Sequence, residues 1–202
     1  MMDLVSNHER LGGETLLGLH RRFMGWAYDL EAPLQVHATQ GIFDLHVTCK
    51  SRQHATQVYL RKRPMLRLGL SYEIMWATKN SGKRTRLKDD VLKEHAAMVA
   101  LMCNAVSSLA PMPYKHPITR LGPANVVRVL APGGAPIDLW IDNEGRLLTA
   151  LIDLGFRRVV FRPCSHFVFD DGKKMHSRWL RDDETPVVLT MLDYERNRYT
   201  AS

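Results

Sequence analysis

Residues 140–161 read WIDNEGRLLTALIDLGFRRVVF, and the way this stretch folds decides the architecture of the C-terminal half of the chain. An apolar run ends in the polar turn 142–146, and a second apolar run follows Gly155. Residues 145–154 between the two runs read as a short helix, for which Gly155 would serve as the C-cap. The stretch therefore predicts a strand, a turn, a helix and a second strand.

The same alternation continues on both sides of that stretch. Short apolar runs that read as strands occupy residues 126–130, 137–141, 158–161, 166–169 and 186–192. A second helix-like piece lies at 173–182, and strands that alternate with short helices indicate an α/β or α+β unit. We expect this unit, with a mixed sheet, to span residues 124–202, after a proline-rich linker or long loop at 110–123.

The residues before that linker predict a different arrangement. Amphipathic spacing predicts helices at 14–30 and 89–109, and alternation predicts a hairpin of strands at 42–49 and 56–63. Residues 65–76 fit either a strand or a helix. Residues 1–110 thus form an N-terminal helix and hairpin part, and the predicted fold class is α+β, as two parts or as one compact domain.

The composition limits the class of protein. The chain has 202 residues, of which 45% are hydrophobic, enough for one sizeable core. The longest apolar runs are far shorter than the roughly 20 residues that cross a bilayer, and the N-terminus lacks the pattern of a secretory signal. We therefore expect a cytoplasmic protein without membrane insertion, whose cysteines, Cys49, Cys103 and Cys164, remain free thiols. These cysteines form no CxxC pair, so neither a metal nor a cofactor is expected.

The formal net charge of +7 comes from one middle segment of the chain. Residues 1–49 carry three basic and six acidic side chains, and residues 89–202 carry fourteen of each. Residues 50–88 carry eleven basic side chains and one acidic one, a net charge of +10. Such a segment attracts polyanions, either nucleic acid or an acidic protein face, although it also fits a solubilising surface. The candidate polyanion-binding residues are Arg61, Lys62, Arg63, Lys79, Lys83, Arg84 and Arg86.

The turn at 142–146 is the first candidate for a phosphate or nucleotide site. If a helix begins there, its first amides have no internal partner and point beyond the N-terminus. Asn143 and Gly145 permit the backbone angles that aim those amides together, and Arg146 would add a charged fork. A plain connection between a strand and a helix is the alternative interpretation.

The same residues resemble the hallmark of the ParB/sulfiredoxin-like superfamily. That hallmark is a strand, Asp-Gly-x-His-Arg or Gly-Cys-His-Arg, a short helix, a glycine and a strand. Asp142 matches the Asp and Arg146 the Arg, while Asn143 and Gly145 replace the Gly and the His. Glu144 occupies the position of the reactive cysteine of sulfiredoxin, so sulfiredoxin chemistry is not expected.

A second stretch, FDDGKKMHSRWLRDDETPVV at 169–188, has the same pattern, with Gly172 and Lys174 in the Gly and basic positions. Which of the two is the family's turn stays open. Some members of the superfamily are plasmid-encoded fertility inhibitors of conjugation, whose GRHRxxWL and PV pattern is similar to GKKMHSRWL and PVV here.

The resemblance implies a non-enzymatic regulator that binds a protein component of a DNA-transfer machine. A nucleotide-hydrolysing or nuclease enzyme and a plain nucleic-acid-binding protein are the alternatives.

Overall fold

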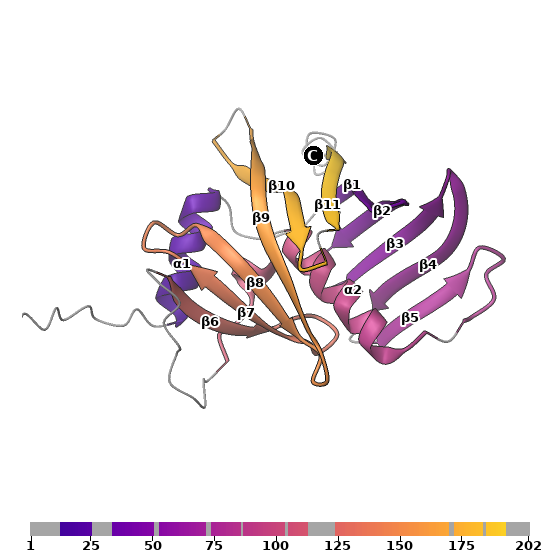
Figure 1. Ribbon diagram of the computed structural model, residues 1–202, viewed down its shortest axis with the longest axis horizontal. Helices are drawn as coiled ribbons and strands as arrows, with labels where there is room; N and C mark the ends of the chain where they lie inside the picture. The colour runs from indigo at the N-terminus through magenta and orange to yellow at the C-terminus, as the bar shows by residue number, and fades with distance from the viewer. Residues whose placement is uncertain are drawn as a thin grey trace, which may run out of the picture.

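The computed structural model describes residues 13–25, 34–50, 53–71, 74–85, 87–103, 105–112, 124–169, 172–183 and 185–192 (Figure 1). The helical segments are α1 (Gly13–Met24), α2 (Asp89–Met102) and the 3-10 helix η1 (Ala105–Ser108). The strands are β1 (Leu34–Gln40), β2 (Phe43–Lys50), β3 (Gln53–Leu60), β4 (Arg63–Ser71), β5 (Ile74–Lys79), β6 (Asn125–Leu130), β7 (Pro136–Ile141), β8 (Leu147–Asp153), β9 (Arg158–Val168), β10 (Lys174–Arg181) and β11 (Pro186–Leu192).

All the described strands belong to one antiparallel sheet, in the order β5-β4-β3-β2-β1-β11-β10-β9-β8-β7-β6. The chain thus forms two meanders, β1–β5 and β6–β11, and the pairing of β1 with β11 joins them. The predicted α+β class with a mixed C-terminal sheet is therefore wrong, because the described part of the chain is mainly β and its strand pairs are antiparallel.

Two segments that the sequence predicts as helices are strands. Residues 145–154 contain β8 and residues 173–182 contain β10, and each strand pairs with a neighbour on both sides. In β8 the buried Ala150 and Ile152 alternate with less buried neighbours, which is the two-residue period of a strand. Leucine and alanine favour a helix weakly, and the pairing of β8 with β7 and β9 overrides that preference.

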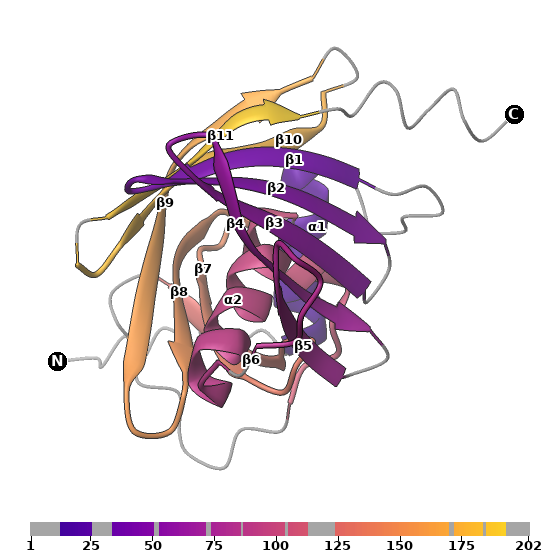
Figure 2. The ribbon, with the colours of Figure 1, turned by 90° about the vertical axis from the view of Figure 1, so that its right-hand side faces the viewer.

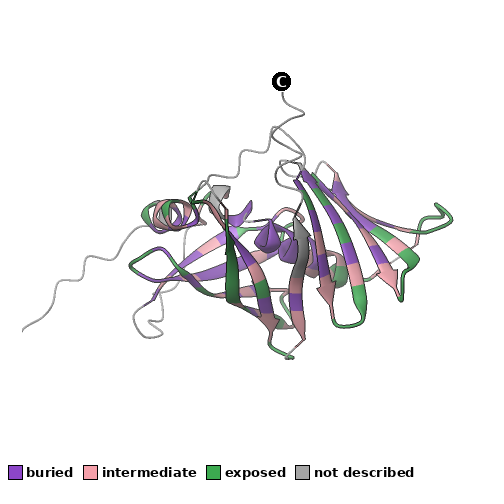
Figure 3. Ribbon diagram, turned by 90° about the horizontal axis from the view of Figure 1, so that it is seen from above, coloured by how far each residue is buried: buried purple, intermediate pink, exposed green. Residues whose placement is uncertain are grey.

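The sheet curls around α2. Figures 1 and 2 show α2 on the concave side of the sheet, with the two meanders on either side of it. Residues 95–102 of α2 are all buried, and residues 97–102 share one core with the inward side chains of the strands and with Leu16 and Leu17 of α1. Figure 3 shows buried residues alternating with less buried ones along the strands, as expected when one face of a sheet covers a core.

The second meander has two opposite ends. The first, called the β8–β9 end, holds the connections from β6 to β7 and from β8 to β9, together with the N-terminus of α2. The second, called the α1 end, holds α1 and the connections from β7 to β8 and from β9 to β10. Helix α2 therefore runs from the β8–β9 end to the α1 end. Neither described α-helix is both long and apolar enough to cross a membrane.

Candidate functional site

A groove of about 900 Å³ lies at the β8–β9 end, between the first turns of α2 and the connection from β8 to β9. Its lining residues are Leu87, Lys88, Asp89, Asp90, Leu92, Lys93, Leu154 and Phe156. Ligand pockets in proteins typically measure about 300–1,000 Å³, so the groove has room for a ligand. We therefore treat it as the candidate binding site.

The apolar side chains of the groove continue the core to the surface. Leu87, Leu92 and Leu154 are half-buried and pack against the core. Phe156 is 76% exposed, although its ring is large and apolar. Exposed apolar surface that is contiguous with a core gains free energy when an apolar ligand covers it. The groove is therefore suited to an apolar molecule.

The charged side chains of the groove come from the start of α2. Lys88 and Lys93 are basic and Asp89 and Asp90 are acidic, so their formal charges cancel. Lys93 Nζ and Asp89 Oδ2 lie 2.7 Å apart in an ion pair between consecutive turns. Such an exposed pair contributes little to stability. The rim of the groove is thus polar but carries no formal excess charge.

Partly buried ion pairs hold α2 beside the groove. The carboxylate of Glu94 accepts a hydrogen bond from Arg157, which follows β8, and forms an ion pair of 3.0 Å with Arg181 of β10. Burial raises the pKa of Glu94, although Arg181 and Arg157 act to lower it. These contacts join one turn of α2 to two strand connections, so they fix the distance between the two sides of the groove.

The predicted polyanion-binding residues lie on or beside two connections of the first meander, the one from β3 to β4 and the turn after β5. Those described are Arg61, Lys62, Arg63, Lys79, Lys83 and Arg84, all exposed. Antiparallel pairing of Leu66 with Lys79 brings the connection from β3 to β4 and the turn after β5 to the same edge of the sheet. Arg86 lies outside the described residues. The binding of a polyanion by these residues stays a prediction.

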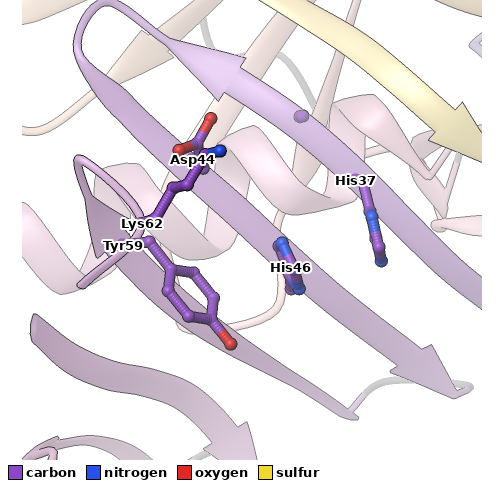
Figure 4. Close-up of a pocket in the computed structure, with 6 residues that line it drawn as sticks. His37, Asp44, His46, Tyr59 and Lys62 are labelled. Carbon is purple, nitrogen blue, oxygen red and sulfur yellow. The ribbon is translucent and has the colours of Figure 1, made fainter. Parts of the chain in front are cut away.

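A smaller hollow of about 240 Å³ lies on the face of β1–β3 that points away from α2 (Figure 4). The rings of His37 and His46 stack there with centroids 4.0 Å apart, and Tyr59 contacts His46 at 4.6 Å. Burial and the neighbouring His37 lower the pKa of His46, although Asp44 acts to raise it. This hollow is below the usual volume of a ligand site, so the groove is the stronger candidate.

In the turn at 142–146, the carboxylate of Asp142 already accepts the hydrogen bonds that a phosphate is predicted to accept. Asp142 accepts hydrogen bonds from the backbone amides of Glu144 and Arg146, at 2.9 and 2.8 Å, and from Arg146 Nε at 2.7 Å. Burial acts to raise the pKa of Asp142, but these hydrogen bonds hold it below its ordinary value. The carbonyl of Gly145 accepts a hydrogen bond from His20 Nδ1 of α1, and Asn143 is exposed.

The second candidate turn also lies beside α1. Lys174 Nζ lies 3.9 Å from the centroid of the Phe23 ring, and Gly172 has a φ of 79°. The structure thus brings both candidate turns to α1, but each connects two strands and neither begins a helix. The helix amides on which the phosphate argument rests are therefore missing, and phosphate binding at Asn143, Gly145, Arg146, Gly172 and Lys174 stays a prediction.

Within the described ranges, no group of three or more His, Cys, Asp or Glu residues could hold a metal ion. The groove could not be recognised in the sequence, because its residues fit the predicted helix, turn and strand around them. Leu92 reads as part of a helix stripe, and Phe156 lies between the predicted C-cap Gly155 and the predicted strand at 158–161. The one available signal was a large aromatic residue directly after Gly155, between a turn glycine and two arginines.

Known structures share this fold. No family model matches the sequence, and no curated protein matches it significantly. A LolA superfamily protein from Nitrosomonas europaea matches with a TM-score of 0.61 at 10% identity, over 90% of this chain and 93% of the other. A putative outer membrane lipoprotein-sorting protein domain from Vibrio parahaemolyticus has a TM-score of 0.54 at 9% identity, over 91% and 94%. A DUF1329 family protein from Desulfovibrio piger has a TM-score of 0.51 at 13% identity, over 91% and 92%.

These matches overturn the resemblance to the ParB/sulfiredoxin-like superfamily. The likeness covers nine-tenths of the chain and includes the single antiparallel sheet, whereas the resemblance needs a strand, helix and strand at 140–161. The predicted function and the predicted partners are therefore wrong. They are the fertility inhibitor of conjugation, the nuclease or nucleotide-hydrolysing alternative, and a nucleic acid or a protein of a DNA-transfer machine as the partner.

Proposed function

We propose that the protein binds an acyl chain, carried by a lipid or by a lipid-modified polypeptide, in the groove at the N-terminus of α2. The observation that carries this proposal is a groove of about 900 Å³ whose apolar side chains continue the core to the surface. The fold adds support, because one protein that shares it is described as a lipoprotein-sorting domain. A lipoprotein is a polypeptide that carries acyl chains, so its ligand chemistry matches the apolar groove.

The expected affinity follows from the apolar surface that the groove offers. Burying about ten methylene groups gains roughly 8 kcal/mol, at about 0.8 kcal/mol for each, which corresponds to micromolar binding. Ordering a flexible chain reduces this gain. The charge-neutral rim favours no particular headgroup by itself. We therefore expect micromolar or weaker binding that depends on chain length.

A titration with an environment-sensitive fluorescent fatty acid tests the proposal. Unlabelled fatty acid, lysophospholipid and an N-acylated peptide then compete for the site, and the unacylated peptide is the control for the polypeptide alone. These competitors distinguish a lipid from a lipid-modified polypeptide. We expect Phe156→Ser to raise the Kd about tenfold, because roughly 1.5 kcal/mol of apolar burial is lost.

Phe167→Ser is the matched control. Phe167 is 40% exposed, like Phe156 an exposed phenylalanine, but it lies on β9 toward the α1 end. Its replacement should leave the Kd unchanged. The groove would be ruled out as an acyl site if no acylated competitor bound, or if Phe156→Ser and Phe167→Ser lost the same amount of affinity.

The basic connections of the first meander suggest where the protein would meet its ligand. Their exposed arginine and lysine side chains would attract an anionic lipid surface. Each basic side chain near such a surface contributes about 1 kcal/mol. The protein would then collect or deliver its ligand at an anionic membrane.

Vesicle sedimentation measures this attraction. With vesicles that contain phosphatidylglycerol, Lys83→Gln/Arg84→Gln should lower the partition coefficient about thirtyfold, which corresponds to about 2 kcal/mol. Arg21→Gln/Arg22→Gln removes two charges from α1 and should have little effect. Binding should vanish at about 1 M salt, where the Debye length is about 3 Å. Equal binding to pure phosphatidylcholine vesicles would contradict the attraction to anionic lipid.

A further inference from the structure

Two cysteines from distant parts of the chain meet inside the core at the α1 end. Cys49 lies near the end of β2, where its backbone pairs with Leu34 of β1 and His54 of β3. Cys103 directly follows α2 and closes its last turn, with its amide bonded to the carbonyl of Val99. The two sulfur atoms lie 2.7 Å apart, and each residue is only 1% exposed.

We propose that Cys49 and Cys103 form an intramolecular disulfide, which joins β2 covalently to the C-terminal end of α2. The S–S bond length is about 2.05 Å, so less than 1 Å of further approach is needed. Elsewhere in the described structure the strands of the first meander contact α2 through side-chain packing and hydrogen bonds alone. The sequence instead predicts free thiols, because a cytoplasmic location is expected from it, and cysteines 54 residues apart give no local sign of pairing.

The chemistry needs an oxidant, and an organic disulfide such as glutathione disulfide is sufficient. One cysteine thiolate attacks the glutathione disulfide, forms a mixed disulfide and releases one glutathione thiolate. The second cysteine then attacks the mixed disulfide, forms the Cys49–Cys103 bond and releases the second glutathione. The two cysteines lose two electrons and two protons, and the glutathione disulfide is reduced to two thiols.

Burial determines when this reaction is fast. Burial, and then the hydrogen bond with Cys103, raises the pKa of Cys49, so few thiolates exist in the folded protein. The same burial keeps a bulky oxidant from reaching either sulfur. We therefore expect the bond to form while the chain folds, or during transient opening of α2, and to resist reduction once the core is closed.

The bond would act on stability and on the motion of α2. It would enclose β3, β4, β5 and α2 in one loop, and closing a long loop restricts the unfolded chain. It would also fix the C-terminal end of α2, while the N-terminal end beside the groove is held by the ion pairs of Glu94. Any movement of α2 that widens the groove would then pivot about Cys103. This proposal does not depend on the nature of the ligand.

The test begins with the purified full chain. The protein is unfolded and refolded once in a buffer rich in glutathione disulfide and once in excess reductant, then denatured and labelled with an alkylating reagent. Intact mass should show one label after oxidation and three after reduction, because the chain has three cysteines. Peptide mapping should place the single label on Cys164, which is exposed.

Thermal unfolding supplies an independent readout. The Tm of the oxidised protein should exceed that of the reduced protein by roughly 10 °C, given the size of the closed loop and of the domain. Cys49→Ala and Cys103→Ala should each abolish this redox-dependent difference, whereas Cys164→Ser should retain it. Three labels after refolding in glutathione disulfide, or a mapped bond that involves Cys164, would overturn the proposal even if the alanine variants fail to fold.

Discussion

Asp142 and Gly145 show how single residues fix the path of the chain between β7 and β8. Asp142 binds the amides of the turn that follows it, and Gly145 takes a φ of 86° that other residues rarely adopt. Gly145 also lies directly against the carbonyl of Leu19 in α1, so no side chain fits there. Gly155, by contrast, has a φ of 84° and open space around it. Both glycines need a positive φ, but only Gly145 also packs against α1. A comparison of the two positions therefore distinguishes the cost of the backbone conformation from the cost of displacing α1.

Alanine at these two glycines should have different costs. Gly155→Ala should lower the free energy of unfolding by about 1 kcal/mol, the cost of a left-handed backbone for a residue with a Cβ. Gly145→Ala should lower it by about 2–4 kcal/mol, because the added Cβ also displaces α1. Chemical denaturation of both variants measures the difference. Equal costs would mean that α1 does not pack against this turn.

The elements that the sequence predicts correctly are those with local signals. Helix α2 begins at Asp89, where the acidic first turn predicts its start, and β2 and β3 form the predicted hairpin. Strands β8 and β10 carry no such signal, because their composition fits a helix. Only their pairing with neighbouring strands makes them strands. The groove is even harder to predict from the sequence. Its two sides meet through Glu94 and Arg157, which are 63 residues apart, so no local pattern could reveal it.

The Glu94 ion pairs should be needed to hold the start of α2 in place. Glu94→Ala should lower the free energy of unfolding by about 1–3 kcal/mol, since Arg157 and Arg181 lose a partly buried carboxylate. Hydrogen exchange of the amides at the start of α2 should also become faster. Asp89→Ala, which removes an exposed ion pair from the same helix, should cost no more than about 1 kcal/mol. A Glu94 variant with unchanged exchange would show that packing alone holds this end of α2.

The whole fold depends on histidines that are buried without charge. Burial lowers the pKa of His54 to about 4. It also lowers the pKa of His95 to about 3, with a contribution from nearby His54. Burial, with His20 and His166, lowers the pKa of His176 to about 3. His54 and His95 lie between α2 and the first meander, and His176 stacks on His20 of α1. Both helices therefore pack on the sheet through neutral imidazole rings.

Acid should consequently destabilise the protein well above the pH at which carboxylates titrate. In the unfolded chain these histidines bind protons below about pH 6.5, but in the folded protein they resist protonation until about pH 3–4. Their contribution to stability is therefore complete above about pH 6.5 and is lost as the pH falls. From pH 7 to pH 5, each of the three histidines lowers the free energy of unfolding by about 2 kcal/mol. Together these losses approach the net stability of a typical domain.

Thermal unfolding at pH 7, 6 and 5 should show a Tm that falls by roughly 10 °C or more. His95→Gln is the decisive variant, because glutamine does not titrate and can still bond to the Thr56 hydroxyl, which lies 2.8 Å from His95 Nε2. This variant should be less stable than the parent protein at pH 7 but should lose about 2 kcal/mol less between pH 7 and pH 5. His37→Gln, on the outer face of β1, leaves His54, His95 and His176 in place and should keep the pH dependence that these three contribute. An identical loss in the two variants would mean that protonation of His95 does not drive acid unfolding.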